Sequence, residues 1–179
     1  MPVDIQPLLE NEDLLLQPLK PEHFDALYKV ASDPAVWVQH PNKDRWQKDV
    51  FQNFFEGALQ SGGAYIIFDK ATGEVAGSTR FYDYSREKDS IFIGYTFYGT
   101  RYWGKGLNPA VKTLMLNYVF TLVSKVYFQI GASNVRSQVA ITRLGARKIG
   151  EEEVAYYGEP VRLNFLYLIE KEDWVNNIG

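Results

Sequence analysis

The pattern of apolar residues in the first third of the chain predicts one strand and two helices. Residues 14–19 are mostly apolar and favour a short strand, and a helix over residues 22–31 follows Pro21 and ends before Pro34. Residues 36–42 predict a loop. A second, amphipathic helix then runs to the Ser61-Gly62-Gly63 turn, because apolar side chains recur at helical spacing. These side chains are Trp46, Val50, Phe51, Phe54, Phe55, Ala58 and Leu59.

The middle of the chain changes to strand signals. Residues 65–68 and 75–82 flank an Ala-Thr-Gly-Glu turn and predict a hairpin. A charged loop at residues 85–89 leads to residues 91–97, where apolar and aromatic side chains alternate and predict a further strand. The alternating side chains are Ile91, Ile93, Tyr95 and Phe97.

The second half of the chain predicts two helices and three more strands. Residues 107–122 keep one helical face apolar throughout, through Leu107, Ala110, Val111, Leu114, Met115, Tyr118, Val119 and Leu122. Residues 126–130 predict a strand, residues 134–144 a short helix, residues 147–157 and 161–169 a last strand pair, and residues 173–179 a peripheral end. The order is β-α-α-β-β-β-α-β-α-β-β. The strand-helix-strand unit at 91–130 predicts one parallel crossover inside a mixed sheet.

Composition narrows the function classes. A length of 179 residues predicts a single domain over residues 1–179, and a net charge of -3 argues against a general nucleic-acid binder. The chain has no cysteine, and its two histidines, His23 and His40, lack metal-ligand spacing, so we expect no metal. We see no signal-like segment and no apolar run near 18 residues, so we expect a cytoplasmic protein without a membrane partner. A homodimer is left open.

A glycine-rich segment between the 91–97 strand and the 107–122 helix contains the candidate chemistry. Gly104 and Gly106 allow a sharp turn and a close approach of backbone to ligand. The amides at the following helix start carry the positive end of the helix dipole, and Arg101 and Lys105 add charge beside them. The segment therefore favours a pyrophosphate site. A plain strand-to-helix turn would use the same glycines for geometry alone.

Two nucleotide-binding motifs overlap this segment, and both are incomplete. Gly99-x-x-x-x-Gly104-Lys105 matches the first seven positions of a Walker A loop, but Gly106 stands where Ser or Thr must hold magnesium. Pro109 stands where the dinucleotide fingerprint requires its third glycine. Asn108 instead predicts a helix N-cap, with Pro109 at the first helical position. A nucleotide-binding protein remains the weaker alternative.

The glycine segment and a downstream motif together resemble the GNAT acetyltransferases. Arg101-x-x-Gly104-x-Gly106, after Gly94-Tyr95, resembles the family's Q/R-x-x-G-x-G/A acetyl-CoA motif. Asn134-x-x-Ser137-x-x-x-Ile141-x-x-Leu144-Gly145-Ala146 and the closing Trp174 resemble the branch of ribosomal-protein N-terminal acetyltransferases. The resemblance covers residues 12–175. It implies the α/β GNAT fold, with a mixed sheet of about seven strands, a V-shaped splay and about four helices.

The resemblance also implies a reaction and a set of site residues. Acetyl-CoA would be the donor, and an amine of a protein N-terminus or a small molecule the acceptor. A bulge near residues 94–97 would splay this strand from the 126–130 strand and aim a backbone N–H at the thioester carbonyl. Asn134 would bond the pantetheine arm, and Ser137 would protonate the leaving thiolate. The cofactor-binding residues would be Phe97, Tyr98, Gly99, Arg101, Gly104, Lys105, Gly106, Leu107 and Asn108.

The chain departs from the family at two catalytic positions. Ile141 stands where many relatives have a tyrosine acid, and Phe92 stands where many have a glutamate. An alkylamine has a pKa of about 10, so its proton needs another route, for which Asp83 or Glu152 acting through water is the candidate. These departures keep a catalytically silent acyl-CoA-binding module open as an alternative.

Several further residues are candidates for the acceptor cleft. Trp37, His40, Tyr82 and Tyr84 lie in or beside loops that border this cleft in the family, although core packing explains any one of them more simply. The run of glutamates at residues 151–153 is interpreted as a solvated charge run.

Overall fold

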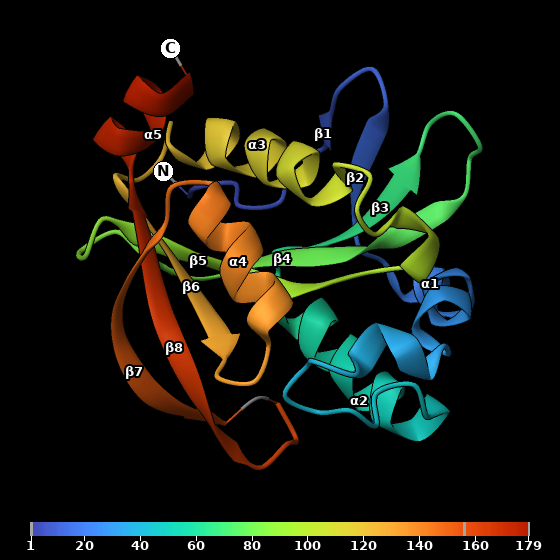
Figure 1. The fold of residues 1–179 in the computed structure, drawn as a ribbon. Helices are drawn as coiled ribbons and strands as arrows, with labels where there is room; N and C mark the ends of the chain where they lie inside the picture. The colour runs from blue at the N-terminus through green and yellow to red at the C-terminus, as the bar shows by residue number, and fades with distance from the viewer. Residues whose placement is uncertain (1, 156, 179) are drawn as a thin grey trace.

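The computed structural model describes residues 2–155 and 157–178, which form a mixed α/β fold (Figure 1). Eight strands of the described residues make one sheet in the order β1-β2-β3-β4-β5-β6-β8-β7. Their bounds are β1 (Leu9–Glu10), β2 (Leu14–Pro18), β3 (Ala64–Asp69), β4 (Val75–Ser85), β5 (Ser90–Tyr98), β6 (Lys125–Gly131), β7 (Arg147–Ala155) and β8 (Val161–Glu170). The last two strands cross over, so that β8 pairs with β6 and β7 lies at the edge.

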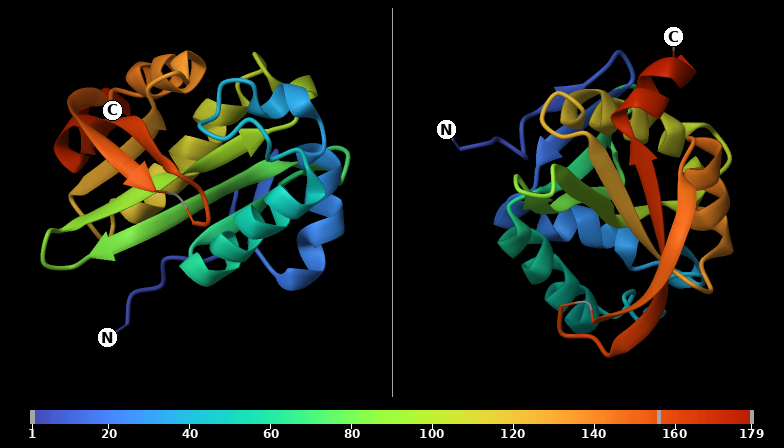
Figure 2. Two further views of the ribbon diagram at one scale, coloured as in Figure 1. Left: turned by 90° about the horizontal axis from the view of Figure 1, so that it is seen from below. Right: turned by 90° about the vertical axis from the view of Figure 1, so that its left-hand side faces the viewer.

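Helices cover both faces of the sheet (Figures 1 and 2). The first two, α1 (Phe24–Ala31) and α2 (Lys48–Ser61), pack on one face, and α3 (Leu107–Val119) and α4 (Val135–Arg143) pack on the other. A fifth helix, α5 (Lys171–Ile178), follows β8. Short 3₁₀ turns precede α1 at Pro21–His23, follow it at Pro34–Trp37 and lie after β5 at Thr100–Tyr102.

The predicted crossover is confirmed. β5 and β6 are parallel, with α3 between them in the chain, while the other strand pairs are antiparallel. A parallel pair needs such a connection, because the chain must return to the same end of the sheet. The pair brings the carboxyl end of β5 and the start of α3 together at one place in the molecule.

Two apolar cores lie on the two faces of the sheet. Successive residues of a strand point to opposite faces, so one strand supplies both cores. In β3, Tyr65 and Ile67 belong to the core under α3, and Ala64 and Ile66 belong to the core under α1 and α2. The sheet is therefore buried on both sides near its centre, which explains why residues 64–67 are apolar without a polar interruption.

The structure corrects the ends of the predicted fold. Strand β1 was not predicted, because two residues give no periodic signal, and the sheet has eight strands where seven were expected. The C-terminal segment is not merely peripheral, since residues 171–178 form α5. Trp174 is 5% exposed, and its Nε1 donates to Asn117 Oδ1 at 2.9 Å. This indole anchors α5 to the helix that starts at the glycine segment.

Candidate active site

Strand β5 separates from its parallel neighbour after a short paired stretch. Pairing with β6 covers Ser90 to Phe92 only, opposite Lys125 to Tyr127. Beyond this point β6 stays paired with β8 up to Gly131, while β5 stays paired with β4 up to Tyr98. The two strands therefore open into the V-shaped splay that the resemblance implies, and their backbone groups in the opening are available to a ligand.

A β-bulge lies in β5 at this opening. Ser78 pairs with Phe97 and Arg80 with Gly94, so that Tyr95 and Thr96 oppose the single residue Thr79. Tyr95 has a φ of 54°, a left-handed conformation that is costly for a residue with a side chain. Its side chain packs against the core of α1 and α2.

The bulge also changes the face on which the later residues of β5 lie. Strict alternation would put Ile93 and Phe97 on the same face. The structure instead places Ile93 in the core under α3 and Phe97 in the core under α1 and α2. The bulge therefore changes the face on which the following side chains lie, at the point where β5 opens away from β6.

The start of α3 depends on two glycines and not on an asparagine cap. Gly104 and Gly106 have φ values of 71° and 80°, a region that glycine enters without a Cβ penalty. Gly106 is the residue before the helix, so the predicted N-cap at Asn108 is wrong. Asn108 lies one residue inside the helix, and its Oδ1 accepts from the Tyr98 hydroxyl at 2.6 Å. Pro109 is then the third helical residue, where a backbone N–H would still lack a helical partner.

A cavity of about 690 Å³ runs from this helix start to the splay. This volume is in the usual range for small-molecule and cofactor sites. The cavity is lined by eight of the residues predicted to bind acetyl-CoA or to act in catalysis. They are Phe97, Tyr98, Gly104, Gly106, Leu107, Asn108, Asn134 and Ser137. Gly99, Arg101 and Lys105 are not among its lining residues. The side chain of Arg101 points elsewhere, because it forms an ion pair with Glu74 and lies over the Tyr102 ring.

Arg136 is a cation that does line the cavity. Its guanidinium lies 3.7 Å from the centre of the Trp103 ring, and burial lowers its pKa. The Arg136 backbone N–H donates to Gln39 Oε1 at 2.9 Å, which joins α4 to the segment after α1. Sequence reasoning missed Arg136, because a single arginine in a short helix gives no signal of its own.

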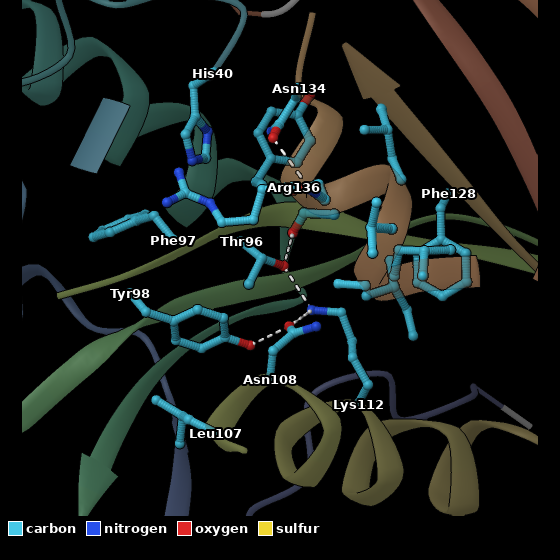
Figure 3. A pocket seen from close by; sticks show the side chains of 18 of the residues that line it. His40, Thr96, Phe97, Tyr98, Leu107, Asn108, Lys112, Phe128, Asn134 and Arg136 are labelled. Atoms are coloured by element: carbon cyan, nitrogen blue, oxygen red, sulfur yellow. Dashed lines mark hydrogen bonds between the residues drawn. The ribbon is translucent and has the colours of Figure 1, made fainter. Parts of the chain in front are cut away.

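Lys112 is a buried lysine beside the same cavity (Figure 3). Its Nζ donates to Thr96 Oγ1 at 2.9 Å and to Asn108 Oδ1 at 3.3 Å, which links α3 to the bulge in β5. Burial lowers the pKa of Lys112 to about 7. Lys112 precedes the apolar Met115 by three residues and so shares its buried helix face. This spacing could have predicted from the sequence that Lys112 is buried.

Asn134 and Ser137 lie together at the start of α4. Asn134 is 5% exposed and is the N-cap of the helix, because its Oδ1 accepts from the Ser137 backbone N–H at 3.2 Å. Asn134 and Ser137 both line the cavity, and Ser137 lies in the first turn of α4. This arrangement is compatible with the roles expected for both residues, which stay predictions.

Of the aromatic and histidine residues named as candidates for the acceptor cleft, some lie in the core and others line a cavity. Trp37 is fully buried and donates its Nε1 to the Ala31 carbonyl at 2.8 Å, so packing explains it. His40 lines the large cavity, and burial, followed by the charges of Arg45 and Arg136, lowers its pKa to about 3. A histidine that is neutral and so weakly basic is a poor general base at neutral pH. Tyr84 packs at the edge of the core.

A second cavity, of about 340 Å³, lies where β4, β5, β6 and β7 come together. Tyr95 and Gln129 line both cavities, so the two cavities are neighbours at the bulge. Gln129 is held in place by two bonds, since its Oε1 accepts from Tyr82 at 2.8 Å and its Nε2 donates to Glu152 at 2.7 Å. Glu152 is therefore bonded toward the cavity and is less exposed than Glu151 and Glu153 on either side of it. The large cavity thus adjoins a smaller, polar one at the splayed strand.

Two features are absent from residues 2–155 and 157–178. No cluster of three or more histidine, cysteine or carboxylate side chains there is arranged to bind a metal ion. In the same residues no helix has the length and apolar character needed to cross a membrane.

Comparisons with known proteins agree with this geometry. The model of the GNAT acetyltransferase domain matches residues 13–147. No curated protein matches the sequence. A GCN5-related N-acetyltransferase from Brucella melitensis superposes with a TM-score of 0.81 at 20% identity, over 95% of this chain and 81% of that one. A GNAT-family acetyltransferase from Bacillus anthracis gives a TM-score of 0.74 at 18% identity, over 93% and 99% of the two chains.

A third solved structure contains a bound coenzyme. Mycobacterium smegmatis RimJ in complex with CoA-disulfide superposes with a TM-score of 0.71 at 17% identity, over 93% of this chain and 87% of that one. Structures this distant in sequence establish the fold, and the domain model establishes the family. The chain belongs to the GNAT acetyltransferase family and is an acyltransferase.

Proposed function

We propose that the chain transfers an acetyl group from acetyl-CoA to a primary amine of a small molecule or a protein N-terminus. The observation that carries the proposal is that two cavities adjoin at the bulge, where Tyr95 and Gln129 line both. One cavity runs from the α3 start to the splay and suits an elongated phosphate-bearing ligand, and the other offers a separate entry for an acceptor. Group transfer needs both partners to meet at one reacting centre.

The α3 start supplies the phosphate end of the proposed donor site. The amides that follow Gly106 have no helical partners and carry the positive end of the dipole, so they favour a pyrophosphate. Arg136 lines the same cavity and adds a cation. The amide side of Asn134 would bond the pantetheine arm. Residues 97–99 would offer backbone groups along the splayed strand.

The bulge supplies the reacting end. When bound, acetyl-CoA supplies an activated acetyl group as a thioester. A backbone N–H at Tyr95 or Thr96 would polarise its carbonyl oxygen, because the splay leaves this part of β5 without a partner in β6. The amine nitrogen forms a bond to the carbonyl carbon as the carbon–sulfur bond breaks. Ser137 would give the leaving thiolate a proton, and the amine proton would pass through water to Asp83 or Glu152.

An acetylation assay tests the proposal. The chain is incubated with acetyl-CoA and a panel of amino acids, peptides, polyamines and aminoglycosides, and free CoA thiol is measured. We expect release above the amine-free rate with at least one class of acceptor. Binding of acetyl-CoA without release for any amine would instead support the silent acyl-CoA-binding module. Thermal stabilisation by ATP and not by acetyl-CoA would support the nucleotide-binding alternative.

A further inference from the structure

The smaller cavity contains a buried cation without an acidic partner. Arg80 of β4 lines it and is only 4% exposed. Among residues 2–155 and 157–178, no carboxylate forms an ion pair with Arg80, and its buried Nε has no hydrogen-bond partner. Burial lowers the pKa of Arg80 to about 10, so the guanidinium stays charged at neutral pH. An unpaired buried charge is costly, so a ligand anion that pairs with Arg80 would relieve this cost.

Two aromatic rings lie close to this guanidinium. Arg80 Cζ lies 3.7 Å from the centre of the Tyr95 ring and 5.4 Å from that of Phe54. Stacking uses the faces of the planar group and leaves its N–H edge for hydrogen bonds. A fork of N–H donors matches the two oxygens of a carboxylate. Because Tyr95 is also the bulge residue, an anion on Arg80 would lie close to the proposed reacting centre.

The other charged groups around the smaller cavity are paired or negative, in contrast to Arg80. Arg45 is nearby, but Glu159 holds it in a buried pair with N–O distances of 2.6 and 2.7 Å, which neutralises it. Asp83 lines the cavity, and Glu152 is bonded to the lining residue Gln129. Among the described residues, the cavity lining thus has one unmatched cation and, separately, the carboxylate of Asp83, with that of Glu152 bonded to Gln129 beside it. Such a distribution complements a ligand with a carboxylate at one end and an amine at the other.

We propose that the acceptor is a small amine that carries its own carboxylate, of the amino-acid class, and that Arg80 binds this carboxylate. The inference rests on the proposed function, since it assigns the acceptor of that same site. A volume of about 340 Å³ is at the small end of ligand sites and suits a molecule of this size. A polyamine would bring further positive charge toward Arg80. A protein N-terminus has an uncharged amide where the amino acid has its carboxylate.

The test compares each standard L-amino acid with its own α-amide. The pair differs in the carboxylate alone, and the amide has the more easily deprotonated amine, so chemistry by itself favours the amide. We expect kcat/KM to be at least about 10-fold higher for the preferred amino acid than for its amide. Hydrogen bonds to charged groups support a factor of roughly 10 to 100. Equal values, or a preference for polyamines or peptides, would overturn the inference.

Two variants and a control tie the preference to Arg80. Arg80→Gln removes the charge and should lower kcat/KM for the amino acid about 10- to 100-fold while leaving the amide unchanged. Arg80→Lys keeps the charge without the fork and should retain part of the preference. Arg86→Gln removes a positive charge from the exposed loop after β4 and should leave the ratio as it is. Acetyl-CoA binding shows that each variant is folded. A ratio that Arg80→Gln does not change would contradict the assignment.

A binding measurement separates this inference from the proposed function. Calorimetric titration of the amino acid into the chain saturated with CoA does not need turnover. Binding of the amino acid and not of its amide, with loss in Arg80→Gln, supports the inference even if no acetyl group is transferred. Absence of binding by every amino acid, alongside acetylation of another amine, would overturn the inference and keep the proposed function.

Discussion

The two glycines before α3 have backbone conformations that other residues seldom adopt. A Cβ built on Gly104 or Gly106 meets no atom within 4 Å, so space in the free protein does not explain their presence. Their φ values of 71° and 80° do, and they also keep the approach to the helix amides open. At the residue scale, the conformation of this loop requires glycine, and the proposed pyrophosphate site would require it as well.

Gly106→Val should abolish acetyl-CoA binding while the chain stays folded. The substitution forces a β-branched residue into a left-handed conformation, at a cost of about 1–2 kcal/mol, and puts atoms where phosphate oxygens would approach. Gly62→Val is the matched control, because Gly62 has a φ of 67° and equally open space at the end of α2. Calorimetry should show lost affinity in the first variant only. Normal affinity in Gly106→Val would mean that the loop does not hold the pyrophosphate.

Lys112 should make stability rise with pH above neutrality. Its folded-state pKa of about 7 lies below the ordinary 10.5, so above pH 7 the folded chain releases a proton that the unfolded chain still holds. The free energy of unfolding then increases between about pH 7 and 10, by at most about 1.4 kcal/mol per pH unit. Lys112→Met should be more stable than the parent at pH 7 and should lose this slope. Urea unfolding at pH 7 and 9.5 measures both, and an unchanged slope would show that another group titrates.

Ser137→Ala should lower turnover by at most about 100-fold, with acetyl-CoA affinity little changed. A thiol has a pKa near 8.5, so the thiolate leaves without a strong acid, and general acid help is typically worth 10²–10⁴-fold. The cap of α4 is retained, because the bond to Asn134 comes from the Ser137 backbone N–H. Steady-state kinetics on the true acceptor check this. Full turnover would transfer the role of proton donor to Tyr95 or another tyrosine.

At the element scale, periodicity predicted most helices and strands to within a few residues. The sequence could not show where regular elements break. The bulge at Tyr95 moves Phe97 to the opposite face from Ile93, and nothing in the alternation of residues 91–97 signals this. The helix start was misplaced for a related reason, since Asn108 has the chemistry of an N-cap but bonds to Tyr98 instead.

The contact between Arg45 and Glu159 fastens the β7–β8 hairpin to the segment before α2. The two side chains are 3% and 6% exposed and far apart in sequence. Glu159→Gln should destabilise the fold by about 3–5 kcal/mol, because it leaves Arg45 buried without its counter-charge. Replacing both residues by methionine should recover much of this loss. Thermal unfolding of the single and double variants tests the coupling, and strictly additive losses would argue against it.

At the scale of the whole molecule, the resemblance of motifs predicted the splay and the glycine loop. It did not predict the smaller cavity, which is the proposed acceptor site. Arg80, Gln129 and Glu152 lie on three strands and meet only through the sheet order, which no short motif encodes. Asp83 and Glu152 were named from the sequence, and they lie at or beside the smaller cavity. Arg80 was missed, because its strand mixes small, polar and aromatic residues and does not reveal that this arginine is buried.

The central claim is that this chain moves an acetyl group from acetyl-CoA to an amine at the bulge, where the two cavities adjoin. Mass spectrometry after incubation with isotope-labelled acetyl-CoA tests it most directly, with amino acids as acceptors and Gly106→Val as the control that should not bind the donor. We expect labelled N-acetyl product with the parent chain and none with the variant. Unlabelled acceptor throughout, with acetyl-CoA demonstrably bound to the parent chain, would contradict the account.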